Sequence, residues 1–407
     1  MATPKLRFKE FDGDWTSKQL GKIIGISSAS RVFKEQWQDS GVPFFRTSDV
    51  VSIFKNKENE KAYISLELFE ELAKKSGKIK QGDLLVTGGG SIGIPYLVPN
   101  DQPLYFKDAD LLWMKSSGIV EGSFLYNFFI SPKFREYLKS ISHTGTISHF
   151  TIEQAKATPF GFPSKEEQTK IASFLSAVDE KISQLTQKHE LLSQYKQGMM
   201  QKLFSQQIRF KADDGSEFGE WEETTLGEIG TFKSGQGFPE QFQGGKDGIP
   251  FFKVSDMNIL GNEKIMKVAN NYVNSEAITK MKAKVIDNEA IIFAKVGAAI
   301  FLERKRLAKN FLIDNNMMAY LSNQKTNIMF LKQFLDNIKL SKFVQVGALP
   351  SYNSSDLAII PISLPCLEEQ TKIADFLSAI DQKLEVVAQQ IEHAKTWKKG
   401  LLQQMFV

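Results

Sequence analysis

Apolar side chains recur at alternating steps of four and three residues in two long segments of the chain. A narrow apolar seam with this period is typical of a coiled coil rather than of a helix with a broad core-facing side. We therefore predict two long helices, over residues 164–204 and 366–407. Their seam consists of Ile171, Leu175, Val178, Ile182, Leu185, Leu192 and Met199 in the first and of Ile373, Leu377, Ile380, Leu384, Val387, Ile391 and Leu401 in the second.

Polar residues interrupt this seam at His189, Lys196 and Lys398. Because an ideal coiled coil is apolar at these positions, we expect the helices to be held together least well there, or to meet a partner. Ser164 and Glu167 have the spacing of a capping box, which predicts where the first helix starts. The second copy has cysteine at the position of that serine.

The two predicted helices are nearly the same sequence. Residues 166–181 read EEQTKIASFLSAVDEK and residues 368–383 read EEQTKIADFLSAIDQK, with thirteen of sixteen positions identical. The segments between them correspond more loosely: LRFKEFDGDW with IRFKADDGSEFGEW, GVPFFRTSDV with GIPFFKVSDM, and KDADLLWM with IDNNMMAY. A plain duplication would conserve both parts about equally, so the weaker match of the intervening segments suggests that they diverged for different targets.

The intervening segments, residues 1–160 and 206–362, mix short apolar runs with Gly, Pro and Asp turn signals. The runs VPFF, GDLLVTGG, GIPYLVP, EAIIFAKVG and LAIIPISLP predict strands. Residues 65–77 and 124–140 predict helices, the latter kinked at Pro132. We therefore expect an α/β (α+β) protein: two similar mixed globular domains joined by two antiparallel coiled-coil helices, with pseudo-two-fold symmetry.

The predicted helices are long enough to act as a spacer. A helix of about 39 residues spans roughly 58 Å. Domains held apart by such helices could contact DNA segments about one helical turn or more apart, at ~34 Å per turn. The alternative is that the coiled coil only dimerises the protein.

Length, charge and cysteine content narrow the class of protein. A chain of 407 residues is too long for one ordinary core. Its 51 Lys and Arg against 47 Asp and Glu leave a net charge of only +4, so any contact with DNA must come from local basic patches. One cysteine and no apolar run of membrane-spanning length favour a cytoplasmic protein that is not attached to a membrane.

The sequence offers no convincing catalytic or metal site. Gly88, Gly90 and Gly93 match the dinucleotide fingerprint by letter, but prolines follow where that fingerprint needs a helix. Asp287, Glu303 and Lys305 only loosely resemble a nuclease triad, and the last two are more simply part of a basic loop. There is no Pro-Pro sequence for an adenine-methyltransferase loop, no phosphate-binding loop and no histidine set. We expect no catalytic residue, no metal and no bound cofactor.

Basic and polar residues beside predicted turns are the candidates for DNA contact. Arg and Lys pair with guanine or grip phosphates, and short polar side chains join them. The candidates are Arg31, Lys34, Arg46, Ser48 and Ser91 in the first domain and Lys253, Ser255, Lys295, Arg304, Lys305, Arg306 and Asn353 in the second.

Over essentially its full length the chain resembles the specificity subunit of Type I restriction–modification enzymes. The resemblance is carried by EEQTKIASFLSAVDEKI with KQGMMQKLF, by their copies EEQTKIADFLSAIDQKL with KKGLLQQMF, and by the paired openings Trp15/Leu20/Gly21 and Trp221/Leu226/Gly227. The chain departs from the simplest pattern at Cys366 and in a four-residue insertion before Trp221.

This resemblance implies that each variable segment is a target recognition domain, reading one part of a split sequence in double-stranded DNA. The constant helices would set the spacing and dock two modification subunits. Those partners would carry S-adenosylmethionine and methyl transfer to adenine, while separate restriction subunits would use Mg²⁺ and ATP. The alternatives are a self-contained DNA methyltransferase or nuclease and a coiled-coil scaffold without a DNA role.

Overall fold

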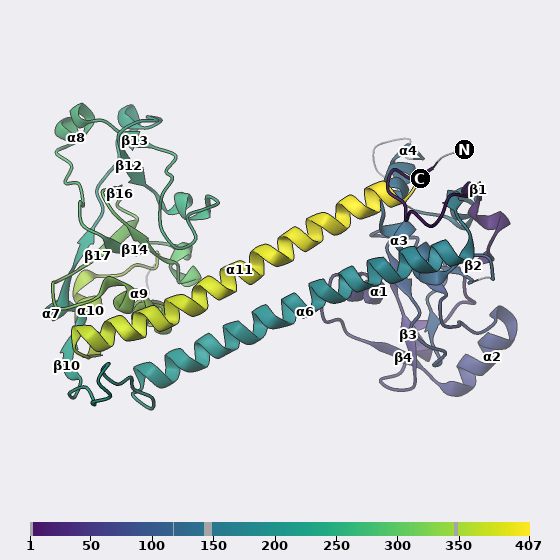
Figure 1. The fold of residues 1–407 in the computed structure, drawn as a ribbon, viewed down its shortest axis with the longest axis horizontal. Helices are drawn as coiled ribbons and strands as arrows, with labels where there is room; N and C mark the ends of the chain where they lie inside the picture. The colour runs from purple at the N-terminus through teal and green to yellow at the C-terminus, as the bar shows by residue number, and fades with distance from the viewer. Residues whose placement is uncertain (1–2, 117, 142–148, 346–348) are drawn as a thin grey trace. The chain divides into compact units, whose positions relative to one another are not determined.

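The computed structural model describes residues 3–116, 118–141, 149–345 and 349–407 (Figure 1). The chain forms two compact units, residues 1–187 with 388–407 and residues 188–387. Each unit therefore contains one variable domain and parts of both long helices.

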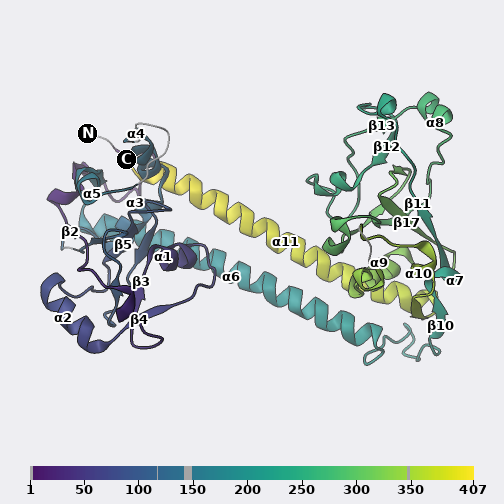
Figure 2. The same ribbon diagram turned by 180° about the vertical axis from the view of Figure 1, so that it is seen from behind.

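The described residues of the first variable domain form three small sheets, some of whose strands are labelled in Figure 2. Four antiparallel strands lie in the order β2 (Ile26–Ser27), β8 (Leu111–Met114), β5 (Leu84–Thr87) and β6 (Pro95–Leu97). A three-stranded sheet follows the order β4 (Ala62–Ile64), β3 (Val42–Phe45) and β7 (Tyr105–Phe106), with β3 and β7 parallel. Strand β1 (Thr16–Gln19) pairs with β9 (Pro159–Phe162). The helices are α1 (Thr47–Phe54), α2 (Leu66–Ser76), α3 (Gly122–Ile130), α4 (Pro132–Ser140) and α5 (Ile152–Ala157).

The second variable domain repeats this arrangement. Its antiparallel sheet has the order β11 (Gly230–Ser234), β17 (Met317–Ser322), β14 (Ala290–Ala294) and β15 (Lys305–Ala308). The three-stranded sheet is β13 (Tyr272–Val273), β12 (Ile249–Phe252) and β16 (Leu312–Ile313), and β10 (Glu222–Thr225) pairs with β18 (Pro361–Leu364). The helices are α7 (Leu226–Ile229), α8 (Ser275–Met281), α9 (Ile328–Asn337) and α10 (Ser354–Ala358). The duplication seen in the sequence is thus a duplication of topology.

Most predicted elements are present. The five apolar runs contain β3, β5, β6, β14 and β18, and the helix predicted over 65–77 is α2. The predicted kink at Pro132 is a complete break, because proline lacks the N–H that a continuous helix needs. The Oγ of Ser131 accepts the N–H of Phe134, so Ser131 ends α3 and caps α4.

The glycine-rich stretch after β5 is a hairpin turn. Gly90 and Gly93 have φ angles of 68° and 70°, and the chain then enters β6 rather than a helix. Because no helix N-terminus follows the glycines, the dinucleotide-binding interpretation is excluded for this turn.

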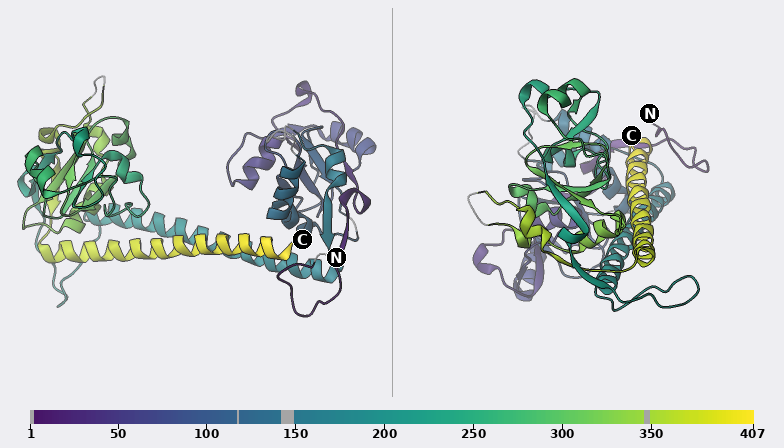
Figure 3. Two further views of the ribbon diagram at one scale, coloured as in Figure 1. Left: turned by 90° about the horizontal axis from the view of Figure 1, so that it is seen from above. Right: turned by 90° about the vertical axis from the view of Figure 1, so that its left-hand side faces the viewer.

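The two long helices are α6 (Lys165–Phe204), of 40 residues, and α11 (Leu367–Met405), of 39. Their segments within each unit run antiparallel (Figure 3). In the first unit, Lys398 bonds to Asp179, and the chain end at Val407 lies against Gly161, just before α6 begins. In the second unit, Lys196 bonds to Asp381 near the other ends of the two helices.

The end of each long helix completes the core of a variable domain. Phe406, which follows α11, lies 5.0 Å from the ring of Phe124 in the first domain. Phe204, the last residue of α6, lies 5.5 Å from the ring of Phe330 in the second. Each core therefore depends on the helix of the other repeat, which explains why both copies end in Phe. Across the described ranges, no helix has the length and apolar character needed to cross a membrane.

Candidate nucleic-acid interface

A buried glutamate attaches each variable domain to the start of its own long helix. Glu167 is 1% exposed, and its two oxygens accept hydrogen bonds from Nε and Nη2 of Arg7, both at 2.7 Å. The indole N–H of Trp15 also donates to Glu167, at 3.3 Å. This pairing favours the charged form of the arginine and raises the pKa of Arg7, chiefly through the hydrogen bond to Glu167.

The second unit contains the same arrangement. Glu369 is fully buried and accepts from Arg209 Nε at 3.1 Å, Arg209 Nη2 at 2.8 Å and Trp221 Nε1 at 3.0 Å. The repeated arginine and tryptophan of the two openings therefore have one structural role. Both openings hold the buried carboxylate at the beginning of a helix.

This contact corrects the capping-box prediction at Ser164. The serine Oγ does accept the N–H of Glu167, at 3.4 Å, but the Glu167 carboxylate turns to Arg7 and Trp15. The reciprocal half of the box is thus replaced by a tertiary ion pair. Local spacing could not reveal this, because Arg7 lies 160 residues away in sequence.

The glutamine that follows Glu167 in the repeated helix sequence forms hydrogen bonds with a loop of the first domain. The Gln168 amide donates to the carbonyl oxygens of Ile119 and Pro163, and its own oxygen accepts the N–H of Glu121. Gln370 binds equivalent groups in the second unit, including the carbonyl of Lys325. Much of the near-identity of the two helices therefore serves the internal structure of each unit.

The apolar seam lies at the contact between the helices. Buried members are Ile171, Leu175, Val178, Leu185, Ile373, Leu377, Ile380, Val387, Ile391 and Leu401. Half-buried members are Ile182, Leu192, Met199 and Leu384.

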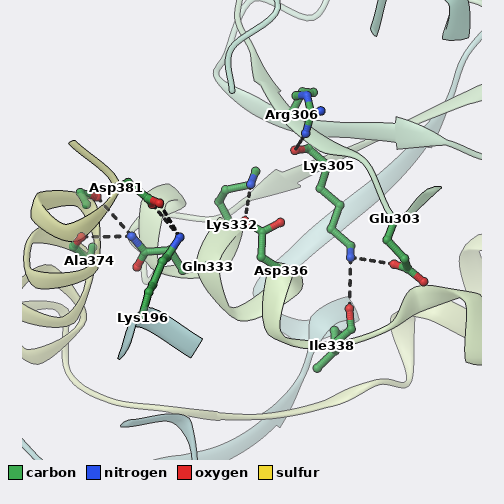
Figure 4. Close-up of polar contacts among 11 residues, drawn as sticks. Lys196, Glu303, Lys305, Arg306, Lys332, Gln333, Asp336, Ile338, Ala374 and Asp381 are labelled. Atoms are coloured by element: carbon green, nitrogen blue, oxygen red, sulfur yellow. Dashed lines mark hydrogen bonds and ion pairs between the residues drawn. The ribbon is translucent and has the colours of Figure 1, made fainter. Parts of the chain in front are cut away.

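Both seam lysines, where the sequence predicts that the helices are held together least well or meet a partner, form ion pairs between the helices. Lys398 Nζ lies 2.6 and 2.7 Å from the two carboxylate oxygens of Asp179 in the first unit. Lys196 Nζ lies 2.7 Å from both oxygens of Asp381 in the second (Figure 4). Each lysine thus bonds across the helix pair, at equivalent positions of the two repeats. His189 is half-buried.

In the first domain, three candidate residues for DNA contact lie near the start of α1. Arg46 precedes the helix, and its guanidinium binds Asp49 at 2.9 Å and stacks over the Trp37 ring at 5.5 Å. Ser48 is exposed in the first turn. The turn carrying the exposed Ser91 lies beside this helix start, since a Cβ on Gly90 would come 3.8 Å from Thr47.

Two further candidates of the first domain are exposed. Arg31 lies 5.5 Å over the Phe33 ring, and Lys34 begins a single 3-10 turn, Lys34–Gln36. Both belong to a different loop from the α1 group, although Trp37 connects the two.

Five of the seven candidates in the second domain lie in two places, beside the 3-10 helix Val254–Asn258 and where Tyr352 meets Lys295. Ser255 is exposed on the 3-10 helix Val254–Asn258, and Arg304 donates to Asn258 of that helix at 2.5 Å. Lys295 and Asn353 are neighbours, because the N–H of Tyr352 bonds to the carbonyl of Lys295. Lys253 is half-buried and bonds to Gln243 at 2.8 Å.

Lys305 is corrected from a DNA-contact candidate to a structural residue. It is 2% exposed, and its ammonium binds Glu303 at 2.8 Å and the carbonyl of Ile338 at 3.1 Å (Figure 4). Strand alternation on β15 turns this side chain inward, which a basic run in the sequence does not show. Glu303 is itself occupied by Lys305 and by backbone N–H groups, so it is not available as a nuclease ligand.

Arg306 is half-buried on the same strand. It donates from Nη1 to the carbonyl of Lys305 at 3.1 Å, while its buried Nε has no partner among the described residues. Burial, followed by repulsion from Arg304, lowers the pKa of Arg306. Among all residues that the structure describes, no group of three or more His, Cys, Asp or Glu side chains could hold a metal ion.

The sequence alone did not reveal the partner of Arg7 and Trp15, and it did not single out three lysines of the second domain. Arg7, Trp15 and their second copies were visible as a repeated pattern, although their common partner was not. Lys233, Lys282 and Lys284, which line one hollow of the second domain, lie in no motif.

Comparisons with known proteins agree with this geometry. A family model described as Type I restriction modification DNA specificity domain matches residues 12–194 and 219–396. The putative Type I restriction enzyme MjaX specificity subunit of Methanocaldococcus jannaschii is 27% identical over 417 residues, covering 98% of this chain and 94% of that protein. The MjaIX specificity subunit of the same organism is 27% identical over 429 residues, covering 97% and 94%.

Two solved structures have the same fold. The Type I restriction–modification S subunit from M. genitalium aligns with a TM-score of 0.57 and 18% identity, covering 100% of this chain and 99% of that one. The HsdS subunit from Thermoanaerobacter tengcongensis aligns with a TM-score of 0.52 and 17% identity, covering 97% of each chain. The two-domain fold with paired long helices is therefore confirmed. The chain belongs to the family of DNA specificity subunits of Type I restriction–modification systems, a family that is not itself catalytic.

Proposed function

We propose that each variable domain reads one half of a bipartite double-stranded DNA target and that the long helices fix the distance between the halves. The observation that carries this proposal is the duplication of one domain topology, each copy followed by a nearly identical helix. Two domains of one architecture, with different loops, suit two different half-sites. A continuous helix of 40 residues provides a rigid element about 60 Å long.

We further propose that the helices dock two copies of a modification subunit, with restriction subunits joining the same assembly. An exposed position that is identical in both repeats, Ala177 with Ala379, supports this. In this proposal S-adenosylmethionine, Mg²⁺ and ATP act on those partners, and this chain supplies target selection.

A binding and turnover experiment tests the proposal against an enzyme and against a scaffold. The full chain is mixed with labelled duplex DNA, with and without its modification subunits. We expect DNA binding in the assembly and no methylation or cleavage by the chain alone when S-adenosylmethionine, Mg²⁺ and ATP are supplied. Robust turnover by the chain alone would support a self-contained enzyme, and no binding at low salt, even in the assembly, would support a scaffold.

A domain exchange tests the assignment of half-sites. Replacing residues 20–158 by the matching segment of another family member keeps β1 paired with β9 and leaves the Arg7–Glu167 pair intact. We expect one half-site to change while the other half-site and the spacer stay the same. A change in both half-sites would contradict the proposal.

A further inference from the structure

A hollow of about 420 Å³ opens on the second variable domain between the end of β11, the loop after α8 and β16. Its charged lining consists of three lysines, Lys233, Lys282 and Lys284. Ser234 and Gln236 add polar groups, and β16 provides an apolar floor. All the charged side chains that line this hollow are therefore positive.

Two of these lysines come directly after α8 in the chain. Lys282 ends the helix with a left-handed φ of 51°, and its N–H bonds to the carbonyl of Thr279 at 3.0 Å. The following residues alternate: Ala283 and Val285 pack into the apolar cluster around β12, whereas Lys282 and Lys284 are exposed. Lys282 and Lys284 both line the hollow.

The opposite wall depends on a glycine. A Cβ on Gly235 would lie 1.8 Å from the carbonyl oxygen of Asp314, so no side chain fits where β11 ends. The close approach lets the N–H of Gln236 bond to the carbonyl of Ile313 at 3.0 Å. The end of β11, with Lys233, is thereby held against the strand that forms the floor.

The charges in this hollow are not neutralised by the protein. The ammonium groups of Lys233, Lys282 and Lys284 have no ion pair or hydrogen bond to any described residue. A fourth lysine, Lys295, donates to Ser234 Oγ at 3.0 Å and so brings its positive charge to the rim. Like charges gathered in one place repel, and an anion placed among them relieves that repulsion.

Two other hollows show how different this lining is. The hollow beside α8 contains Lys280, but that lysine is paired with Glu276 at 2.6 Å, and Asp247 adds a second negative charge. The hollow beside α1 in the first domain includes Asp49 and Glu58 together with Lys57 and Lys61. Both hollows therefore mix acidic with basic side chains, unlike the lysine-lined hollow.

From this geometry we propose that the lysine hollow, defined by Lys233, Lys282 and Lys284, binds a phosphate group of the DNA backbone. This inference rests on the proposed DNA-reading function and adds a residue-level contact to it. A phosphate offers oxygens to several ammonium donors at once, and the Ser234 hydroxyl and the Gln236 amide can donate beside them. Contacts of this kind position the protein on the duplex but carry no base sequence.

The test is the salt dependence of DNA binding by the assembly of the full chain with its modification subunits. The variant carries Lys233→Gln, Lys282→Gln and Lys284→Gln, and the matched control is Lys325→Gln, an exposed lysine elsewhere in the domain. Losing one phosphate contact should lower the slope of log K against log salt by about 0.9. The Kd should then rise about fivefold near 0.15 M salt and about fifteenfold near 0.05 M.

The loss should be equal for cognate and non-cognate DNA, and Lys325→Gln should leave slope and Kd unchanged. Because all three lysines are exposed, the thermal unfolding midpoint of the variant should match that of the wild type. An unchanged slope and Kd in the triple variant would overturn the site while leaving the proposed function intact. A wild-type assembly that binds no DNA would remove the proposed function, and this site with it.

A second measurement identifies the source of the phosphate. Reductive methylation of lysines, followed by mass spectrometry, reports how well Lys233, Lys282 and Lys284 are covered. We expect duplex DNA to protect them and inorganic phosphate at equal ionic strength to leave them reactive. Equal protection by inorganic phosphate alone would make this a free-anion site and overturn the assignment to DNA.

Discussion

Neutralising Glu167 should lower the free energy of unfolding of the first unit far more than neutralising its exposed neighbour Glu166. In Glu167→Gln the side chain keeps its size but loses the charge that pairs with Arg7. Removing one partner of a buried ion pair costs about 3–5 kcal/mol, because the remaining charge is left without compensation. The Arg7 side chain is 14% exposed and can partly turn to water, so we take the lower end, about 3 kcal/mol.

The effect should be confined to one unit. For a unit of roughly two hundred residues, a loss of about 3 kcal/mol lowers the unfolding midpoint by roughly 6–12 °C. Hydrogen exchange followed by mass spectrometry should show faster exchange in peptides from 1–187 and 388–407 than in those from 188–387. Glu369→Gln should produce the opposite pattern, since it breaks the equivalent pair with Arg209.

Glu166 provides a matched control at the same helix start. Its carboxylate is exposed, and Glu166→Gln removes the same charge without touching Arg7 or Trp15. If Glu167→Gln were no more destabilising than Glu166→Gln, the buried pair would not be what holds the domain to its helix. A double-mutant cycle with Arg7→Gln should then also show no coupling.

Three further predictions concern the helix seam, the spacer and one buried tyrosine. Lys398→Asp or Asp179→Lys alone should lower the free energy of unfolding by about 1 kcal/mol, measured by denaturant unfolding. The double variant, which exchanges the two charges, should recover this loss, and additive losses would contradict a direct interaction between the two residues. A heptad added within 182–196, together with one in the matching segment 384–398, lengthens the two helices by about 10 Å. The spacer between the DNA half-sites should then lengthen by about three base pairs while both half-sites stay the same, and an unchanged spacer would contradict the proposal that the helices set its length. Burial raises the pKa of Tyr320, so the contribution of this tyrosine to stability is complete below pH about 10 and is lost as the pH rises from there towards the folded pKa. Tyr320→Phe should therefore reduce the loss of stability at alkaline pH, measured by denaturant unfolding at several pH values. The same alkaline loss in wild type and variant would show that Tyr320 does not cause it.

Periodicity and repetition in the sequence were sufficient to predict several elements. The two long helices and the strands around VPFF and EAIIFAKVG follow from patterns of two, three and four residues. Contacts between distant residues do not follow from such patterns. Glu167 has the spacing of a capping residue, yet its carboxylate accepts hydrogen bonds from Arg7, because the fold brings the guanidinium within 2.7 Å.

The basic residues also show that the sequence does not reveal which side chains are buried or lie close together. Lys305 stands in a basic run, and only the inward face of β15 reveals that it is buried. Lys282 and Lys284 belong to the stretch KMKAK, whose spacing does not show that they line one hollow with Lys233, close to where Gly235 lets the end of β11 approach β16. Charge along the sequence therefore predicted which residue types matter but not which of them share a surface.

The central claim is that this chain chooses a bipartite DNA target for partner enzymes. Genome-wide mapping of methylated adenines, in one host with and without the chain, tests it most directly. The account predicts a split motif, two specific half-sites separated by a fixed spacer, that is methylated only when the chain is present. An unchanged methylation map, or a single uninterrupted motif, would contradict it.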